Sequence, residues 1–378
     1  MRSWTAIGAT VATVLLGMVI GRSALLTPAV RSVDEKALRE YVGVYQWEPN
    51  SFVYLQMWNE FTGTNQLVAF DESGEVRTLY PTDRDRFFAG PGAAVAASIE
   101  SRTEFHRDAT GKITSLMWQR EGAPLRNARR VEIERHENVR FSSGDIQLAG
   151  TLISPITGEK HPAIILVHGS GPENREYMLP FARFLIRHGM AVLGYDKRGV
   201  GGSTGDWNTA SFDDLADDVV AAFEYLKTRS DVDSRQIGLL GVSQAGWIMP
   251  LAAQKARPAF MVLMVGPTVS VGIEGFYSRI VEETNAPVEE GYKQLSSFNG
   301  FHGFDPKPVL EALNVPGLWL LGGEDRSIPT PATVEILDQL IASGKPYARV
   351  VFPGFGHNLF GAPYWPEIDK WLSKILPE

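Results

Sequence analysis

Three residues in the C-terminal half of the chain have the types and the order that nucleophilic catalysis requires. Ser243 lies in GVSQAG, Asp325 in GGEDRSIP and His357 in FPGFGHNLF, and each motif follows an apolar run that predicts a buried strand. A serine hydroxyl is a weak nucleophile until an imidazole takes its proton. A carboxylate holds that imidazole in the right tautomer and stabilises its cation. The order therefore predicts a nucleophile, an acid and a base.

The segments around these residues alternate between strand-like and helix-like patterns from about residue 139 onward. Apolar or alternating runs predict strands over 146–155, 162–169, 190–196, 237–242, 260–266, 317–323 and 348–352. Helical spacing predicts helices over 175–187, 211–226, 333–342 and 365–375, and one that starts at residue 244. This alternation predicts a mostly parallel, doubly wound α/β sheet with helices on both faces. Ligands of such sheets bind at the carboxyl ends of the strands.

The neighbours of Ser243 are small, as a sharp strand-to-helix turn requires. Gly241 and Ala245 stand two residues before and after the serine, and Gly246 follows. Backbones approach closely at such a turn, and the helix N-terminus behind it favours developing negative charge. Because Ala245 stands where the usual motif has glycine, we expect a slightly fuller turn.

Five motifs in order, HGSGP, DKRGVGGSTG, GVSQAG, GGEDRSIP and GFGH, resemble those of the α/β-hydrolase superfamily over about residues 139–378. Within it, the chain is most similar to bacterial serine esterases of the dienelactone-hydrolase and serine-aminopeptidase types. The resemblance implies that Ser243 is the nucleophile, Asp325 the acid and His357 the base. It also implies an oxyanion hole made by the backbone amides of Gln244 and Ser170.

The acid has a competitor next to it in the sequence. Glu324 immediately precedes Asp325, and either carboxylate follows the strand at 317–323. Members of the superfamily place the acid just before a short loop that ends in a proline, here Pro329. That placement favours Asp325.

A long insertion separates the predicted strands at 260–266 and 317–323. It has about 50 residues, more than a crossover needs, and its pattern is mostly helical with a break near Pro287. The resemblance implies a lid over the nucleophile, with predicted bounds of about 268–306. Phe276, Tyr277 and Tyr292 are the candidate substrate-binding residues of an apolar acyl site. The alternative is that these side chains only pack the insertion onto the sheet.

The N-terminal third of the chain has a different character. Arg2 precedes an uncharged, apolar run over residues 3–21, which predicts that residues 1–30 are a secretory signal, a membrane anchor or a buried helix. A cleaved signal implies export to the periplasm or the medium, and an anchor implies membrane association.

Over 33–135, short alternating runs with turn-like DESGE and DATGK predict an antiparallel, β-rich accessory domain with one face exposed to solvent. Its layout resembles the lipocalin-like β modules that accompany some bacterial serine hydrolases.

Composition excludes several classes of function. The net charge of −8 argues against a nucleic-acid partner, which would need a concentrated basic surface. The chain has no cysteine, so disulfides, thiolate metal sites and a cysteine nucleophile are excluded. No phosphate-binding glycine loop and no H-E-x-x-H motif occurs, so we predict neither a metal site nor a cofactor.

The sequence therefore predicts a catalytic domain over 138–378 that hydrolyses small carboxylic esters through an acyl-enzyme. A peptidase or an acyl thioesterase with the same three residues is the first alternative. A non-catalytic binding protein at a cell envelope is the second, and the intact set of three residues argues against it.

Overall fold

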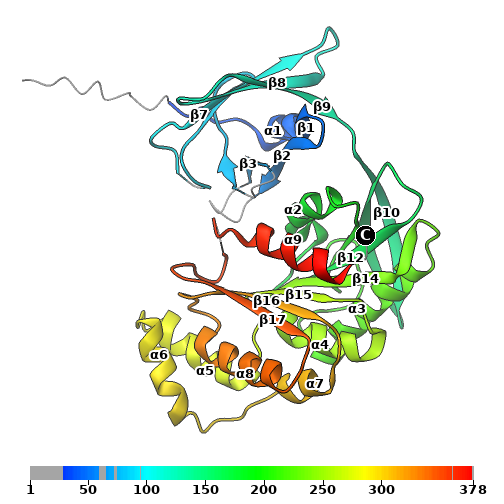
Figure 1. The fold of residues 1–378 in the computed structure, drawn as a ribbon, viewed down its shortest axis with the longest axis vertical. Helices are drawn as coiled ribbons and strands as arrows, with labels where there is room; N and C mark the ends of the chain where they lie inside the picture. The colour runs from blue at the N-terminus through cyan, green and yellow to red at the C-terminus, as the bar shows by residue number, and fades with distance from the viewer. Residues whose placement is uncertain (1–28, 59–64, 72–74, 94, 360, 377–378) are drawn as a thin grey trace, which may run out of the picture.

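The computed structural model describes residues 29–58, 65–71, 75–93, 95–359 and 361–376. The predicted signal or anchor lies outside the described residues, except for its last two positions. In the part that is described, no helix is long and apolar enough to span a membrane. Two sheet-based units, an N-terminal β module and a larger α/β unit, are stacked along the long axis of the molecule (Figure 1).

The β module is an antiparallel sheet preceded by α1 (Glu35–Leu38) and a 3-10 turn at Arg39–Tyr41. Its strands are β1 (Gly43–Glu48), β2 (Ser51–Trp58), β3 (Gln66–Asp71), β4 (Arg77–Thr78), β5 (Tyr80–Asp83), β6 (Arg86–Ala89), β7 (Ser101–Arg107), β8 (Ile113–Arg120) and β9 (Arg126–Val131). They follow the order β4-β3-β2-β1-β9-β8-β7-β6-β5 in a strongly curved, barrel-like sheet. The module has a core of its own, which includes Tyr45, Leu55, Leu67, Phe105 and Leu116.

Strand β2 is buried on both faces, unlike the predicted sheet with one exposed face. Successive side chains of a strand point to opposite faces. Val53 and Leu55 belong to the core of the β module, whereas Tyr54 and Trp58 pack in a cluster with the α/β unit. The prediction of a solvent-exposed face is wrong for this strand, because the α/β unit covers that face.

The larger unit is an α/β sheet, which confirms the predicted fold class. Its strands are β10 (Glu134–Ser143), β11 (Ile146–Pro155), β12 (His161–Val167), β13 (Ala191–Tyr195), β14 (Val232–Val242), β15 (Met261–Met264), β16 (Gly317–Gly322) and β17 (Tyr347–Phe352). They follow the order β10-β11-β13-β12-β14-β15-β16-β17. The strands from β13 to β17 run parallel, and β11 is antiparallel to both of its neighbours.

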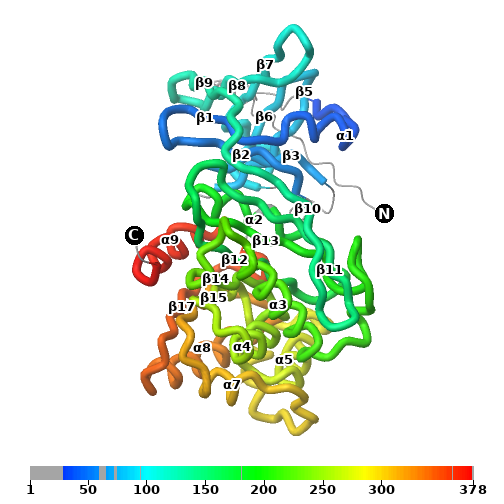
Figure 2. Tube along the Cα trace, turned by 90° about the vertical axis from the view of Figure 1, so that its right-hand side faces the viewer, coloured from blue at the N-terminus to red at the C-terminus, as the bar shows by residue number. Residues whose placement is uncertain are grey.

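Helices cover both faces of this sheet (Figures 1 and 2). One core cluster contains side chains of α3 (Phe212–Lys227), α4 (Ala245–Ala256), α7 (Lys307–Ala312) and α8 (Thr330–Ala342). The cluster on the other face contains side chains of α2 (Arg175–Ile186) and α9 (Tyr364–Ile375). Burying both faces explains why the central strands read as continuous apolar runs.

The β module rests on helices α2 and α9. The rings of Phe70 and Phe184 stack at 4.2 Å between centroids, and Phe184 stacks in turn on Trp365 at 3.9 Å. Trp58 meets Phe181 edge-on at 6.1 Å. Each such aromatic pair contributes about 0.5–1.5 kcal/mol beyond the burial of its area. The module is thus fixed to the α/β unit by a continuous aromatic cluster.

The insertion between β15 and β16 is helical. It contains α5 (Val271–Ser278), a π-helical turn at Arg279–Glu283, α6 (Val288–Gln294) and a 3-10 turn at Leu295–Ser297. The Tyr277 hydroxyl donates a 2.7 Å hydrogen bond to the carbonyl oxygen of Asp325. This insertion is therefore tied to the loop that follows β16.

Candidate active site

Ser243 stands on a sharp turn between β14 and α4. Its φ of 52° lies in the left-handed region, which a residue with a side chain adopts only under constraint from its surroundings. Its backbone N–H donates a 2.9 Å hydrogen bond to the carbonyl oxygen of Met264, at the end of the neighbouring strand. The turn therefore projects the serine side chain from the carboxyl edge of the sheet.

The glycines around Ser243 explain why the alanine at position 245 is tolerated. A Cβ added to Gly241 would lie 2.5 Å from the Cβ of Ala245, so a side chain is excluded at 241 and the methyl group occupies that space. A Cβ added to Gly246 would lie 2.6 Å from Pro267. The close approaches that require glycine in this turn are thus at 241 and 246.

The structure brings Ser243, His357 and Asp325 together in one chain of hydrogen bonds. His357 Nε2 lies 3.0 Å from Ser243 Oγ. On its other side, His357 Nδ1 lies 2.9 and 3.1 Å from the two carboxylate oxygens of Asp325. The imidazole is thus placed to accept the serine proton at Nε2 while Nδ1–H donates to the carboxylate.

The carboxylate in this arrangement is Asp325 and not its neighbour Glu324. Asp325 is 1% exposed, and its Oδ1 also accepts hydrogen bonds from the backbone N–H groups of Ser327 and Ile328 at 2.9 and 2.8 Å. Glu324 is exposed to solvent. The loop after β16 fixes the orientation of Asp325 because three donors converge on its carboxylate.

Two backbone N–H groups near Ser243 are left to bind an oxyanion. The N–H of Gly169 already donates to Glu173 Oε2 at 2.8 Å, so the next N–H group, that of Ser170, is the first one available in this loop. Within the described chain, neither the Ser170 N–H nor the Gln244 N–H has an acceptor. Gln244 is also the N-cap of α4, whose N-terminal field favours negative charge.

Lys197 holds these two backbone segments together. Its ammonium group donates hydrogen bonds to the carbonyl oxygens of Gly169 and Gly171, at 2.8 and 3.2 Å, and to Gln244 Oε1 at 3.0 Å. The residue is only 2% exposed. Burial lowers the pKa of Lys197 to about 8, although the charge of Glu173 opposes this shift.

Replacing Lys197 with methionine should lower kcat by about 10–100-fold, because the loop with Ser170 loses its anchor to Gln244. In the wild type, kcat should also fall above pH of about 8, as the ammonium group loses one of its donors. The Lys197→Met variant should lack this alkaline limb. Steady-state kinetics from pH 6 to about 10 would measure both effects.

Lys255→Met is the matched control for this variant, since Lys255 on α4 pairs at the surface with Asp213 and Asp217. It should leave kcat and its pH profile unchanged. Wild-type kcat in Lys197→Met, or an alkaline limb that persists in that variant, would contradict a positioning role for Lys197.

The electrostatics of the site suit a general base near neutral pH. Burial lowers the pKa of His357, but the hydrogen bond and charge of Asp325, helped by Glu282 and Glu274, outweigh this and raise it above its ordinary value. On α5, burial raises the pKa of Glu274 to about 7, while the charge of His357 lowers it. Among the described residues, no three His, Asp or Glu side chains are grouped as metal ligands.

This shift predicts an acid limb in the pH–rate profile. His357 must be neutral to accept the serine proton, so kcat/KM for an uncharged ester should fall about tenfold per pH unit below the pKa of His357. Since that pKa is raised, the apparent pKa of the acid limb should lie above that of an ordinary histidine. A profile that stays flat down to about pH 5 would show that His357 is not the base.

The cavity at Ser243 has a volume of about 200 Å³ and receives side chains from both units. Trp58 comes from β2 of the β module, and Tyr177 and Phe181 come from α2. Apart from Ser243, His357, Asn358 and the loop at 169–173, its wall is apolar or aromatic and includes Val242, Met264, Val265, Leu359 and Tyr364.

The candidate substrate-binding residues of the insertion do not line this cavity. Tyr277 is 1% exposed, and its hydroxyl is used by the carbonyl oxygen of Asp325. Phe276 packs on Phe298 with 5.4 Å between ring centroids, and Tyr292 is 37% exposed. The positions of Tyr277 and Phe276 fit the alternative of packing, because they contact the loop after β16 and the insertion itself, whereas Tyr292 is exposed.

Sequence reasoning missed Trp58, Tyr177, Phe181 and Lys197. A signal existed for Trp58: it shares the strand face of Tyr54, opposite the face that forms the core of the β module. Aromatic side chains on a second face of a strand indicate that something covers it. Lys197 lies in the DKRGVGGSTG motif, but nothing in that motif shows that its side chain is buried against the loop of Ser170.

Known proteins that resemble this chain include hydrolases. Residues 158–288, which include Ser243, match the family model described as serine aminopeptidase, S33. Esterase EstD of Thermotoga maritima is 24% identical over 286 residues, which cover 66% of this chain and 67% of that protein. The acylamino-acid-releasing enzyme of Mus musculus is 24% identical over 257 residues, 64% of this chain but only 34% of that protein.

A solved structure shows the same fold. The Pyrococcus furiosus esterase Pf2001 aligns with a TM-score of 0.52 and 19% identity, over 64% of this chain and 92% of its own. The chain is therefore similar to serine hydrolases over residues 158–288, and its larger unit has the α/β-hydrolase fold.

Proposed function

We propose that the chain is a carboxylic-ester hydrolase that acts through an acyl-enzyme on Ser243. The observation that carries the proposal is the hydrogen-bond chain from Ser243 Oγ through His357 to Asp325, with links of 3.0 and 2.9 Å. Ser243, at one end of this hydrogen-bond chain, has its backbone in the left-handed region. This arrangement can activate a hydroxyl group for attack on a carbonyl carbon.

In the acylation step, Ser243 Oγ forms a bond to the ester carbonyl carbon as its proton passes to His357 Nε2. The carbonyl oxygen becomes an oxyanion, to which the N–H groups of Ser170 and Gln244 donate. When this intermediate collapses, the bond to the alcohol oxygen breaks and His357 gives its proton to that oxygen. Asp325 stays ionised throughout and stabilises the imidazolium.

In the deacylation step, the roles repeat with water in place of the serine. His357 takes a proton from a water molecule, whose oxygen attacks the acyl carbon. The bond to Ser243 Oγ then breaks, and His357 returns the proton to the serine. The products are the carboxylic acid and the free enzyme, so no cofactor or metal is required to balance the reaction.

The cavity favours an uncharged acyl group. Its side-chain wall is mostly apolar, and the carboxylate of Glu173 is engaged with the N–H of Gly169 at 2.8 Å. Amide hydrolysis with the same residues is a second candidate, which the serine-aminopeptidase family model and the mouse acylamino-acid-releasing enzyme favour.

A matched panel of substrates distinguishes the two candidates. The butyrate p-nitrophenyl ester, the butyryl p-nitroanilide, the butyryl thioester and an aminoacyl p-nitroanilide would be compared by kcat/KM, with Ser243→Ala as the background. The proposal predicts the highest kcat/KM for the ester. It also predicts that the rate enhancement over buffer is largest for the ester, so that its greater intrinsic reactivity does not explain the result. A larger rate enhancement over buffer for either anilide would assign the chain to the peptidases instead.

A further inference from the structure

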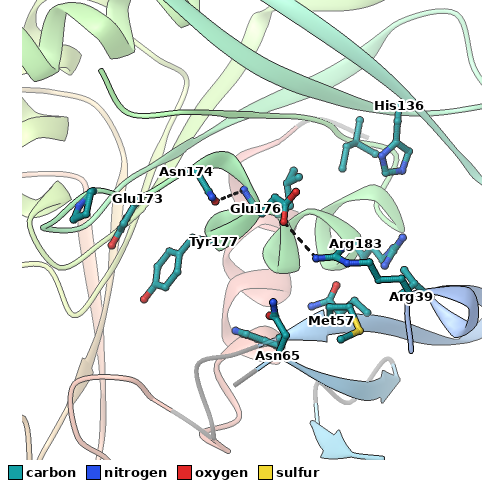
Figure 3. A pocket seen from close by; sticks show the side chains of 15 residues that line it. Arg39, Met57, Asn65, His136, Glu173, Asn174, Glu176, Tyr177 and Arg183 are labelled. Carbon is teal, nitrogen blue, oxygen red and sulfur yellow. Dashed lines mark hydrogen bonds and ion pairs between the residues drawn. The ribbon is translucent and has the colours of Figure 1, made fainter. Parts of the chain in front are cut away.

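A second and larger cavity lies between the β module and the α/β unit. Its volume is about 490 Å³, within the range of about 300–1,000 Å³ that is usual for small-molecule sites. The cavity at Ser243, at about 200 Å³, is below that range. In Figure 3, Met57 and Asn65 lie on the side of the β module, and Glu173, Tyr177 and Arg183 lie on the side of the α/β unit.

The two cavities are neighbours. Trp58, Glu173 and Tyr177 line both of them, so the same three side chains stand between the interdomain cavity and Ser243. Two of these three come from the α/β unit, and Trp58 comes from β2. A substrate that fills the cavity at Ser243 and extends past these side chains enters the space between the two units.

Gln56 is the polar group that marks the interdomain cavity. It lines this cavity and is only 5% exposed, yet its Nε2 has no hydrogen-bond partner among the residues that the structure describes. It lies between Tyr54 and Trp58 in β2, on the strand face that points to the α/β unit. Buried amide groups are nearly always hydrogen-bonded in folded proteins, so this donor points to a ligand acceptor.

The charged side chains of the interdomain cavity already have partners. Arg39 pairs with Glu35 and Glu176, at 2.6 and 3.7 Å. Arg183 pairs with Glu134 at 2.9 Å, and that carboxylate also contacts His136. A charged ligand would have to displace these pairs, whereas a neutral one would not.

We propose that the interdomain cavity is the distal part of the substrate site, and that Gln56 donates a hydrogen bond to a carbonyl or ether oxygen in an uncharged chain of the substrate. The substrate class is therefore a neutral, extended ester with a second oxygen function remote from the reacting carbonyl. This inference rests on the proposed ester hydrolysis at Ser243. It assigns to the β module a direct part in substrate selection.

Two variants test the proposal with two sets of probe esters. The first set is p-nitrophenyl acetate, p-nitrophenyl decanoate and a p-nitrophenyl decanoate with one oxo group in the distal half of its chain. The second set, the acetates of decanol and of an oxo-decanol, places the long chain on the alcohol side. Gln56→Leu removes the donor at similar size, and Asn65→Trp fills the cavity from its β-module side.

For Gln56→Leu, we expect kcat/KM for the oxo ester to fall about fivefold to tenfold, because one hydrogen bond is lost. This loss should occur in one of the two sets, the one whose long chain enters the interdomain cavity. The values for the plain decanoate and the acetate should stay within about twofold. The thermal midpoint of this variant should not fall, because the substitution removes a buried donor that has no acceptor in the described part of the chain.

For Asn65→Trp, both long esters should lose about tenfold in kcat/KM, while the acetate keeps its value. Thr114→Trp, on an exposed position of β8 in the same module, is the matched control and should change none of the ratios. Equal losses on all probes, or unchanged ratios in both variants, would overturn the proposal. If the wild type hydrolyses p-nitrophenyl acetate through Ser243 but the kcat/KM ratios of long to short esters do not change in either variant, only the interdomain site is rejected. If the wild type shows no Ser243-dependent hydrolysis of p-nitrophenyl acetate, the proposed function itself is rejected.

Discussion

Replacing Ser243 with alanine should lower kcat for ester hydrolysis by about 10⁵-fold, the scale of nucleophile deletions in enzymes of this mechanism. The physical reason is that no acyl-enzyme can form, and a water molecule at the vacated position is not held against His357 Nε2. KM should change little, since the cavity wall and the oxyanion donors remain. Stopped assays with p-nitrophenyl butyrate would measure the residual rate above buffer.

The matched control is Ser170→Ala. Ser170 contributes its backbone N–H to the oxyanion hole, and the residue is exposed, so loss of its hydroxyl should leave kcat within a few-fold of wild type. Residual activity of Ser243→Ala close to wild type would remove the basis of the proposed mechanism. Equal losses in the two serine variants would indicate a general disturbance of the loop and not the loss of a nucleophile.

Replacing Asp325 with asparagine should lower kcat by about 10⁴-fold. An amide cannot stabilise the imidazolium, and its NH₂ group would favour the tautomer in which Nδ1 accepts, which leaves Nε2 protonated and unable to accept the serine proton. The two N–H groups of Ser327 and Ile328 would still have an oxygen to bind, so the loop should keep its shape. The acid limb of the pH profile should also move to lower pH, because the charge that raises the pKa of His357 is gone.

Glu324→Gln provides the control for this variant, because Glu324 is exposed and adjacent in sequence. We expect wild-type kcat for it. If Glu324→Gln lost activity and Asp325→Asn kept it, the acid would be Glu324, and the hydrogen bonds of Asp325 to His357 would have no catalytic role.

The fold of the α/β unit could be predicted because its signals are local. Buried parallel strands are continuous apolar runs, and the caps and glycines between them lie beside the strands they end. The positions of Ser243, Asp325 and His357 could be predicted for the same reason: each lies in the loop that follows a strand, and the carboxyl ends of parallel strands meet at one edge.

The contribution of the β module could not be predicted, because it depends on how two units pack. The alternation in β2 indicates a strand, but it does not reveal what covers the face of Tyr54, Gln56 and Trp58. From sequence, the aromatic side chains of the insertion could either form an acyl site or pack the insertion onto the sheet. A tertiary contact, the hydrogen bond of Tyr277 to the loop of Asp325, favours packing. A buried, loop-anchoring Lys197 is likewise a product of tertiary structure.

The most direct test of the central claim is to locate the covalent adduct of a fluorophosphonate by mass spectrometry. Trypsin releases residues 236–255 as one peptide, QIGLLGVSQAGWIMPLAAQK, in which Ser243 is the sole hydroxyl-bearing residue. We expect stoichiometric label on this peptide, parallel loss of ester hydrolysis, and no label in His357→Ala within the same time. Label on a different peptide, or an unlabelled 236–255 peptide in protein that has lost its activity, would contradict Ser243 as the nucleophile.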